Sequence, residues 1–187
     1  EQFFKYLCEN ELEIYNEFSF QHELGIFFRE KFRVNCEDFK EYKIEFERNA
    51  KKYFHVNYAM VEDQKLKKEI DLVVYKKDHS LQYAVELKFP LNGQYPEQMF
   101  NFVKDVRFMQ ELVNQKIFKR TYCITLVWAV GKGRPFFRGG IEGSRGVDIY
   151  KYFRNENNLL YGKIIKPTGL NSNKYIVDLQ DKVYPFT

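Results

Sequence analysis

Three ionisable residues in the middle of the chain, Asp71, Glu86 and Lys88, have types and spacing that could perform hydrolytic chemistry. Glu86 and Lys88 interrupt LQYAVELKF, residues 81–89, which otherwise has the composition of a buried β-strand. Charged side chains rarely enter such a strand unless the surface that they face is wet, paired or chemically used. This strand therefore predicts either a polar surface or a site.

The preceding strand EIDLVVYKK, residues 69–77, brings Asp71 to the same place. A short polar turn separates the two strands, and pairing about it puts Asp71 directly opposite Glu86. Opposed like charges destabilise a strand pair, so we expect a divalent cation between the carboxylates, and Mg²⁺ or Mn²⁺ favours such oxygens. Lys88 would then orient or deprotonate a water on the cation and stabilise charge developing on a phosphate.

An ordinary polar hairpin face is the competing interpretation. Side chains alternate along a strand, so one face is predicted to be core, carrying Ile70, Leu72, Val74, Tyr83, Val85 and Leu87. The other face carries Asp71, Val73, Ala84, Glu86 and Lys88. Glu69 would lie opposite Lys88, and the two could form a plain cross-strand ion pair. The small residues Val73 and Ala84 favour a site, but the sequence leaves both interpretations open.

The periodicity of the chain predicts the elements that hold these strands. Residues 11–33 have an apolar stripe at helical spacing, and residues 42–48 alternate as a strand does. A second helix follows Pro96 and ends near residue 116, before an apolar strand over residues 120–130. This αβββαβ order predicts an α/β fold in which helices flank a mixed β-sheet.

The C-terminal part differs in composition. Six of the ten glycines lie in residues 131–146, which are predicted to be a loop. Two short strands, over residues 161–166 and 174–180, are predicted to form a hairpin. With no repeat and no second core evident, we expect a single domain over residues 1–187, with its core at about 11–130 and an extension at 131–187.

Composition excludes several classes of protein. Aromatic residues make up 18% of the chain and hydrophobic residues 44%, so a disordered chain is excluded. The net charge of +4 does not by itself indicate a nucleic-acid binder. No apolar run is long enough for a membrane span, and no secretory leader is evident. The three cysteines are widely spaced, which predicts reduced thiols and a cytoplasmic location.

Asp71, followed by Glu86-x-Lys88 at the end of the next strand, resembles the PD-(D/E)xK nuclease superfamily, whose fold is called restriction-endonuclease-like. The similarity extends over residues 11–130 through the αβββαβ order. The resemblance implies that Asp71 and Glu86 bind the metal, that the carbonyl of Leu87 completes its shell, and that Lys88 assists the attacking water. Many members of the superfamily lack the proline of the motif's name, as does this chain.

The resemblance also implies two further site residues. Many members add a Glu from the first helix, and Glu23 is similar to it, although Glu17 competes and either could be a solvated helix residue. A subset, the RecB-type nucleases, places a Gln early in the following helix, and Gln98 matches that position loosely.

The loop at residues 131–146 has a local excess of positive charge. Its basic residues Lys132, Arg134, Arg138 and Arg145 suit a phosphate backbone, and Phe136 and Phe137 could stack on an unpaired base. A merely solvated loop is the alternative. His22, His55 and His79 have no ligand-like spacing, and no Walker motif is present, so zinc and ATP chemistry are not expected.

These features predict a Mg²⁺- or Mn²⁺-dependent nuclease that hydrolyses phosphodiester bonds, in DNA rather than RNA. Two alternatives remain: a non-catalytic nucleic-acid-binding module on the same fold, and a scaffold protein whose hairpin charges lie only at the surface. Because double-strand cleavage by single sites usually requires two copies, a homodimer is a further expectation.

Overall fold

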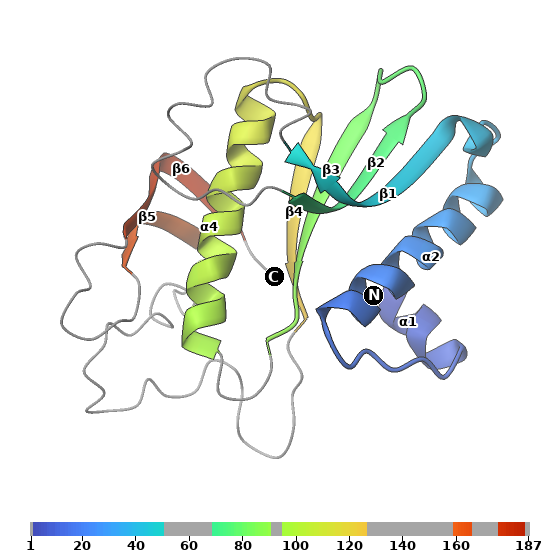
Figure 1. The fold of residues 1–187 in the computed structure, drawn as a ribbon, viewed down its shortest axis with the longest axis horizontal. Helices are drawn as coiled ribbons and strands as arrows, with labels where there is room; N and C mark the ends of the chain where they lie inside the picture. The colour runs from blue at the N-terminus through green and yellow to red at the C-terminus, as the bar shows by residue number, and fades with distance from the viewer. Residues whose placement is uncertain (1, 51–68, 91–94, 127–158, 166–175, 186–187) are drawn as a thin grey trace. The chain divides into compact units, whose positions relative to one another are not determined.

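The structure is a computed structural model that describes residues 2–50, 69–90, 95–126, 159–165 and 176–185 (Figure 1). The chain divides into two compact units. The first comprises Glu1–Phe89 with Phe108–Ile124, and the second comprises Pro90–Arg107 with Thr125–Thr187.

A four-stranded mixed sheet forms the framework of the first unit, as expected for an α/β protein. Its spatial order is β1 (Tyr42–Asn49), β2 (Glu69–Lys76), β3 (Gln82–Lys88) and β4 (Arg120–Thr125). The β1–β2 and β2–β3 pairs are antiparallel. The strands predicted at 42–48, 69–77 and 81–89 are thus confirmed. Of the strand predicted at 120–130, the first six residues are confirmed and residues 127–130 lie outside the described residues.

The hairpin register also agrees with the prediction. Leu72 lies opposite Val85, and Val73 lies opposite Ala84. At the turn, the Ser80 amide donates to Asp78 Oδ1 at 2.9 Å, and His79 adopts a left-handed φ of 57°. An aspartate that bonds the backbone two residues ahead is a common turn device.

The helices are α1 (Gln2–Glu9), α2 (Glu17–Asn35), a short 3-10 turn η1 (Phe39–Glu41) and α4 (Tyr95–Asn114). The helix predicted after Pro96 is confirmed, but the expectation of one helix over 11–33 is wrong at its start. Glu11 has a left-handed φ of 52°, which breaks the helical path, and α2 begins only at Glu17. Helix α1, which packs aromatic residues against α2, was not predicted from the sequence.

A capping box fixes the first turn of α2. Asn16 Oδ1 accepts the Ser19 amide at 2.7 Å, and Ser19 Oγ accepts the Asn16 and Tyr15 amides at 3.1 and 3.0 Å. These bonds satisfy amides that a helix start otherwise leaves without partners. Glu17 therefore begins the helix at a defined position.

Replacing Ser19 with Ala should lower the free energy of unfolding by about 1 kcal/mol, because the hydroxyl serves two backbone amides. Urea denaturation measures the change. Ser80→Ala, which removes a hydroxyl from an exposed turn, is the matched control and should change stability less. An unchanged midpoint for Ser19→Ala would contradict the capping role.

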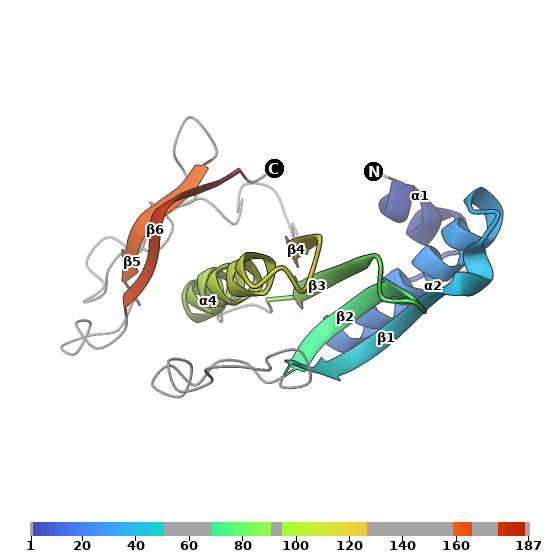
Figure 2. The same ribbon diagram turned by 90° about the horizontal axis from the view of Figure 1, so that it is seen from above.

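Helices cover both faces of the sheet in the first unit. Helix α2 packs against β1, β2 and β3 (Figures 1 and 2). A Cβ added at Gly25 of α2 would lie 2.3 Å from Phe46 Cζ of β1, so helix and sheet approach closely there. The opposite face carries Val73 and Ala84, which cluster with other buried residues of the first unit, among them Phe108, Met109, Leu112 and Phe118.

The second unit contains a two-stranded antiparallel sheet of β5 (Leu159–Ile165) and β6 (Ile176–Pro185), which confirms the predicted C-terminal hairpin. The loop predicted at 131–146 lies outside the described residues.

Cys8, Cys36 and Cys123 are free thiols, as expected. Within the described ranges, no helix has the length and apolarity needed to cross a membrane.

Candidate functional site

Three charged residues are buried where β2 begins and β3 ends, at the end of the hairpin away from its turn. Asp71, Glu86 and Lys88 expose only 4%, 1% and 9% of their surfaces. Val73 and Ala84, on the same face of the hairpin, are fully buried as well. The interpretation of this face as an ordinary solvated one is therefore wrong. Burying two carboxylates near one ammonium group is costly unless each charge has partners.

The β2–β3 ladder opens at these residues. The last paired positions are Leu72 and Val85, although β2 continues back to Glu69 and β3 on to Lys88. Asp71 and Glu86, which were expected to face one another as a ladder pair, lie just past this point. Their side chains enter the opening and bond the main chain of the facing strand.

Both carboxylates accept bonds from backbone amides across this opening. Asp71 Oδ2 accepts the Leu87 amide at 2.7 Å, and Glu86 Oε1 accepts the Asp71 amide at 3.4 Å. The two acidic groups therefore converge on one place between β2 and β3. A carboxylate offers about four lone-pair positions, so a carboxylate that accepts an amide bond can bind a cation as well.

Lys88 is held over the same opening. Its Nζ donates to the Leu87 carbonyl at 2.9 Å and lies 3.5 Å from Glu17 Oε1. The other oxygen of Glu17 accepts the Phe89 amide at 3.4 Å. The ion pair predicted between Lys88 and Glu69 as the alternative is wrong. Lys88 pairs with Glu17, and the exposed Glu69 lies opposite Asn49 of β1.

The structure separates the two helix glutamates that competed for the site. Glu17 reaches Lys88, whereas Glu23 lies beside Tyr6 of α1. Burial raises the pKa of Tyr6, and the negative charges of Glu30 and Glu23 raise it further. Glu23 is roughly 200° round the helix from Gln21, so it cannot share the face that contacts the sheet at Asp71.

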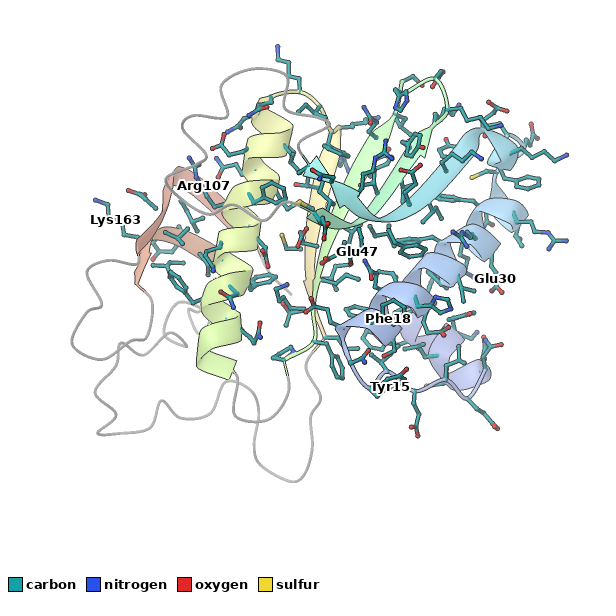
Figure 3. The ribbon with its side chains drawn as sticks, viewed as in Figure 1. Tyr15, Phe18, Glu30, Glu47, Arg107 and Lys163 are labelled. Atoms are coloured by element: carbon teal, nitrogen blue, oxygen red, sulfur yellow. The ribbon has the colours of Figure 1, made fainter. Side chains whose placement is uncertain are left out.

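Two residues that contact the site were missed in the sequence. Gln21, only 4% exposed, donates from Nε2 to Glu47 Oε1 at 2.8 Å and to the Asp71 carbonyl. Glu47 lies in β1 (Figure 3). The sequence did contain a signal for Gln21. Glu17, Gln21 and Leu24 occupy positions i, i+4 and i+7, so the polar residues Glu17 and Gln21 lie on the apolar stripe of the helix.

Several predicted site residues cannot be placed against these strands. Gln98 lies in the part of α4 that belongs to the second unit, so its role stays a prediction. The basic residues expected to bind substrate lie outside the described residues: Lys132, Arg134, Arg138 and Arg145. His55 is likewise outside them, while His22 and His79 are exposed and stack on Phe18 and Tyr75.

The donor set suits a hard cation that keeps much of its water. Asp71 and Glu86 supply carboxylate oxygens, and Leu87 supplies a carbonyl that faces the Lys88 ammonium group. In the part of the chain that the structure describes, no group of three or more His, Cys, Asp or Glu side chains could hold a metal. Mg²⁺ commonly binds through one or two carboxylates with water completing the octahedron, so Asp71 and Glu86 fit it. A closed zinc site needs four protein ligands, which these two carboxylates do not provide.

The site thus combines two buried carboxylates, a carbonyl and an ammonium group from β2 and β3, with Glu17 of α2 beside the ammonium group. Carboxylates that converge in a buried opening can bind a divalent cation, and an adjacent ammonium group can stabilise an anion bound to it. No protein-family model, no curated protein and no solved structure matches the chain.

Proposed function

We propose that the chain is a metal-dependent nuclease domain with a restriction-endonuclease-like fold, acting on phosphodiester bonds in DNA. The observation that carries the proposal is the burial of Asp71, Glu86 and Lys88 together at the open end of the β2–β3 hairpin. A purely structural hairpin has no need of two buried carboxylates there, because apolar residues would fill the space at lower cost.

In the proposed reaction, Asp71, Glu86 and the Leu87 carbonyl would hold the metal. A bound Mg²⁺ or Mn²⁺ would supply Lewis-acid chemistry at the scissile phosphate and lower the pKa of water. Lys88, held by the Leu87 carbonyl at 2.9 Å, orients the attacking water and offsets negative charge that develops on the phosphate. The Glu17 carboxylate, 3.5 Å from Lys88 Nζ, helps to hold the ammonium group in place.

The rest of the substrate site belongs to the same proposal. Gln98 and the basic residues of loop 131–146 keep the roles that the sequence predicts for them, Gln98 in the reaction and the loop residues in binding the substrate backbone. The described residues hold one such site, so cleavage of both strands of a duplex would use two copies of the chain, which is why we propose a homodimer.

A binding module on the same fold is the second candidate. Nothing in nucleic-acid binding alone requires two buried carboxylates, since a phosphate backbone is attracted to positive charge. The scaffold alternative, with its hairpin charges at the surface, does not fit the observed burial.

One experiment separates these functions. The chain is incubated with plasmid, linear duplex, single-stranded DNA and RNA, with Mg²⁺, Mn²⁺ or chelator. A nuclease cleaves at least one DNA only with metal, a binding module retards DNA in chelator without cleaving it, and a scaffold does neither. Cleavage of RNA but not DNA would overturn the proposed substrate, and no cleavage in any lane would overturn the nuclease.

Asp71→Asn should abolish cleavage and metal binding while leaving the metal-free protein as stable as the parent or more so. The amide oxygen can still accept the Leu87 amide, and the change removes a buried like charge beside Glu86. At a Mn²⁺ concentration of about 100 times its dissociation constant, binding stabilises the parent by about 2.7 kcal/mol, and the variant should lose this. Thermal unfolding with and without Mn²⁺ measures it.

Asp78→Asn is the matched control, since it makes the same chemical change at the exposed turn of the same hairpin. It should retain the stabilisation by Mn²⁺. If Asp71→Asn is still stabilised by Mn²⁺ to the same extent as the parent, Asp71 is not a metal ligand.

A further inference from the structure

Asp71 has an unusual main-chain environment in the described part of the sheet. The β2–β3 ladder has ended beside it, and side chains bond its backbone. Its amide donates to Glu86 Oε1 at 3.4 Å, and its carbonyl accepts Gln21 Nε2. The placement of its carboxylate therefore depends on residues from another strand and from a helix.

Gln21 links three elements at this point. It extends from α2 and bonds both Glu47 of β1 and Asp71 of β2, and it is 4% exposed. A buried amide is costly unless its polar atoms are satisfied, so these bonds determine where Gln21 lies. Since the chain could bury an apolar residue there, as it does at Phe20 and Leu24, the amide calls for a specific role.

Glu47 orients that amide. The same NH₂ group of Gln21 reaches both Glu47 Oε1, at 2.8 Å, and the Asp71 carbonyl. A side-chain amide can rotate to present either its NH₂ group or its oxygen. An ionised carboxylate only accepts hydrogen bonds, so Glu47 selects the NH₂ group, which is the end that the Asp71 carbonyl requires.

The backbone of Glu47 is itself strained. Its neighbours Phe46 and Arg48 lie opposite Leu72 and Ile70, which puts Glu47 across from Asp71. Its φ is 50°, in the left-handed region that is unfavourable for a residue with a Cβ and rare within a strand. Such strain persists where the surroundings impose it, and it clusters at functional sites.

We propose that Gln21 and Glu47 are positioning residues: Glu47 fixes the Gln21 amide, and Gln21 holds the main chain of Asp71 so that its carboxylate stays in the β2–β3 opening. The inference rests on the proposed function. Neither residue touches the metal or the substrate. Both act through Asp71, as the hydrogen-bond partners of metal ligands do in other proteins.

Four variants of the full chain test this by calorimetric titration with Mn²⁺ and by thermal unfolding without metal. Gln21→Met keeps the volume and removes the donor, and Glu47→Ala removes the carboxylate. Each should weaken Mn²⁺ binding by about 10–100-fold. Glu47→Gln keeps an acceptor but can also present its own NH₂ group, so its affinity for Mn²⁺ should lie between those of Glu47→Ala and the parent.

Glu47→Gly distinguishes positioning from a merely structural role. Glycine adopts a positive φ readily, so this variant should unfold at the parent's temperature or higher, yet bind Mn²⁺ as weakly as Glu47→Ala. If the residue served only stability, affinity would follow the melting temperature, and Glu47→Gly would bind as the parent does.

Gln82→Met is the matched control for Gln21→Met. Gln82 also donates from Nε2 to a backbone carbonyl, that of Ile117 at 3.2 Å, but at the other end of β3. It should lose stability without losing Mn²⁺ affinity. If Gln21→Met binds Mn²⁺ as tightly as Gln82→Met, the positioning role is overturned and the nuclease proposal stands. If the parent shows no Mn²⁺ binding that depends on Asp71, both are overturned.

Discussion

Lys88→Met is expected to reduce cleavage by about 10²–10⁴-fold in single-turnover assays, the range typical for a group that assists proton transfer. Methionine fills the same volume but cannot donate, so the water and the phosphate lose the ammonium group that the Leu87 carbonyl and Glu17 hold in place. Mn²⁺ affinity should stay the same or increase, because a positive charge beside the cation is removed. Calorimetric titration with Mn²⁺ measures this second quantity.

Lys77→Met is the matched control for this variant. Lys77 lies just past β2, and its Nζ is 3.5 Å from Glu41, the same distance as in the Lys88–Glu17 pair, but it is much more exposed. It should cleave at the parent's rate. A Lys88→Met protein that cleaves as fast as the Lys77→Met protein would remove Lys88 from the mechanism.

Gly25→Val is expected to lower the free energy of unfolding by about 3 kcal/mol, because a larger side chain in a filled space forces neighbours out of position. Even a Cβ at this position would come within 2.3 Å of Phe46 Cζ and 2.5 Å of Cε1. Moving the ring would also disturb its contact with the Arg29 guanidinium, which lies 5.5 Å from its centroid. Urea denaturation gives the size of the effect.

A double-mutant cycle with Phe46→Leu tests the cause of this loss. In the Phe46→Leu background the added side chain has more room, so Gly25→Ala should become stabilising by up to about 1 kcal/mol through the helix propensity of alanine. If Gly25→Ala changes stability by the same amount in both backgrounds, the ring is not what requires glycine.

The elements near the hairpin were predictable because their signals are local. Alternation and turn residues are sufficient to define β2, β3 and their register, so the convergence of Asp71 and Glu86 followed from the sequence. The opening of the ladder beyond Leu72 and Val85 was not predictable, because it depends on how β2 is held from its other side. The periodicity of residues 11–33 also did not predict that Glu11 adopts a left-handed φ and that the helix begins only at Glu17.

The contacts that complete the site escaped the sequence analysis for a related reason. Glu17 and Glu23 were both candidates as helix glutamates, because the spacing that places Glu17 with Leu24 on the apolar stripe was not used; the structure shows that Glu17 is the one that meets Lys88. Gln21 has no charge or motif to mark it. Glu47 is typical of an exposed strand position, and its left-handed φ is a property of the folded chain alone.

The bonds around Asp71 and Lys88 join parts of the chain that are distant in sequence, with separations of 16 residues for Asp71–Leu87, 50 for Gln21–Asp71 and 71 for Glu17–Lys88. Closing such loops costs entropy, so we expect this cluster to form only once α2, β2 and β3 have come together. A cation that binds there would recognise only the native chain, and its affinity would therefore report on complete folding of the first unit.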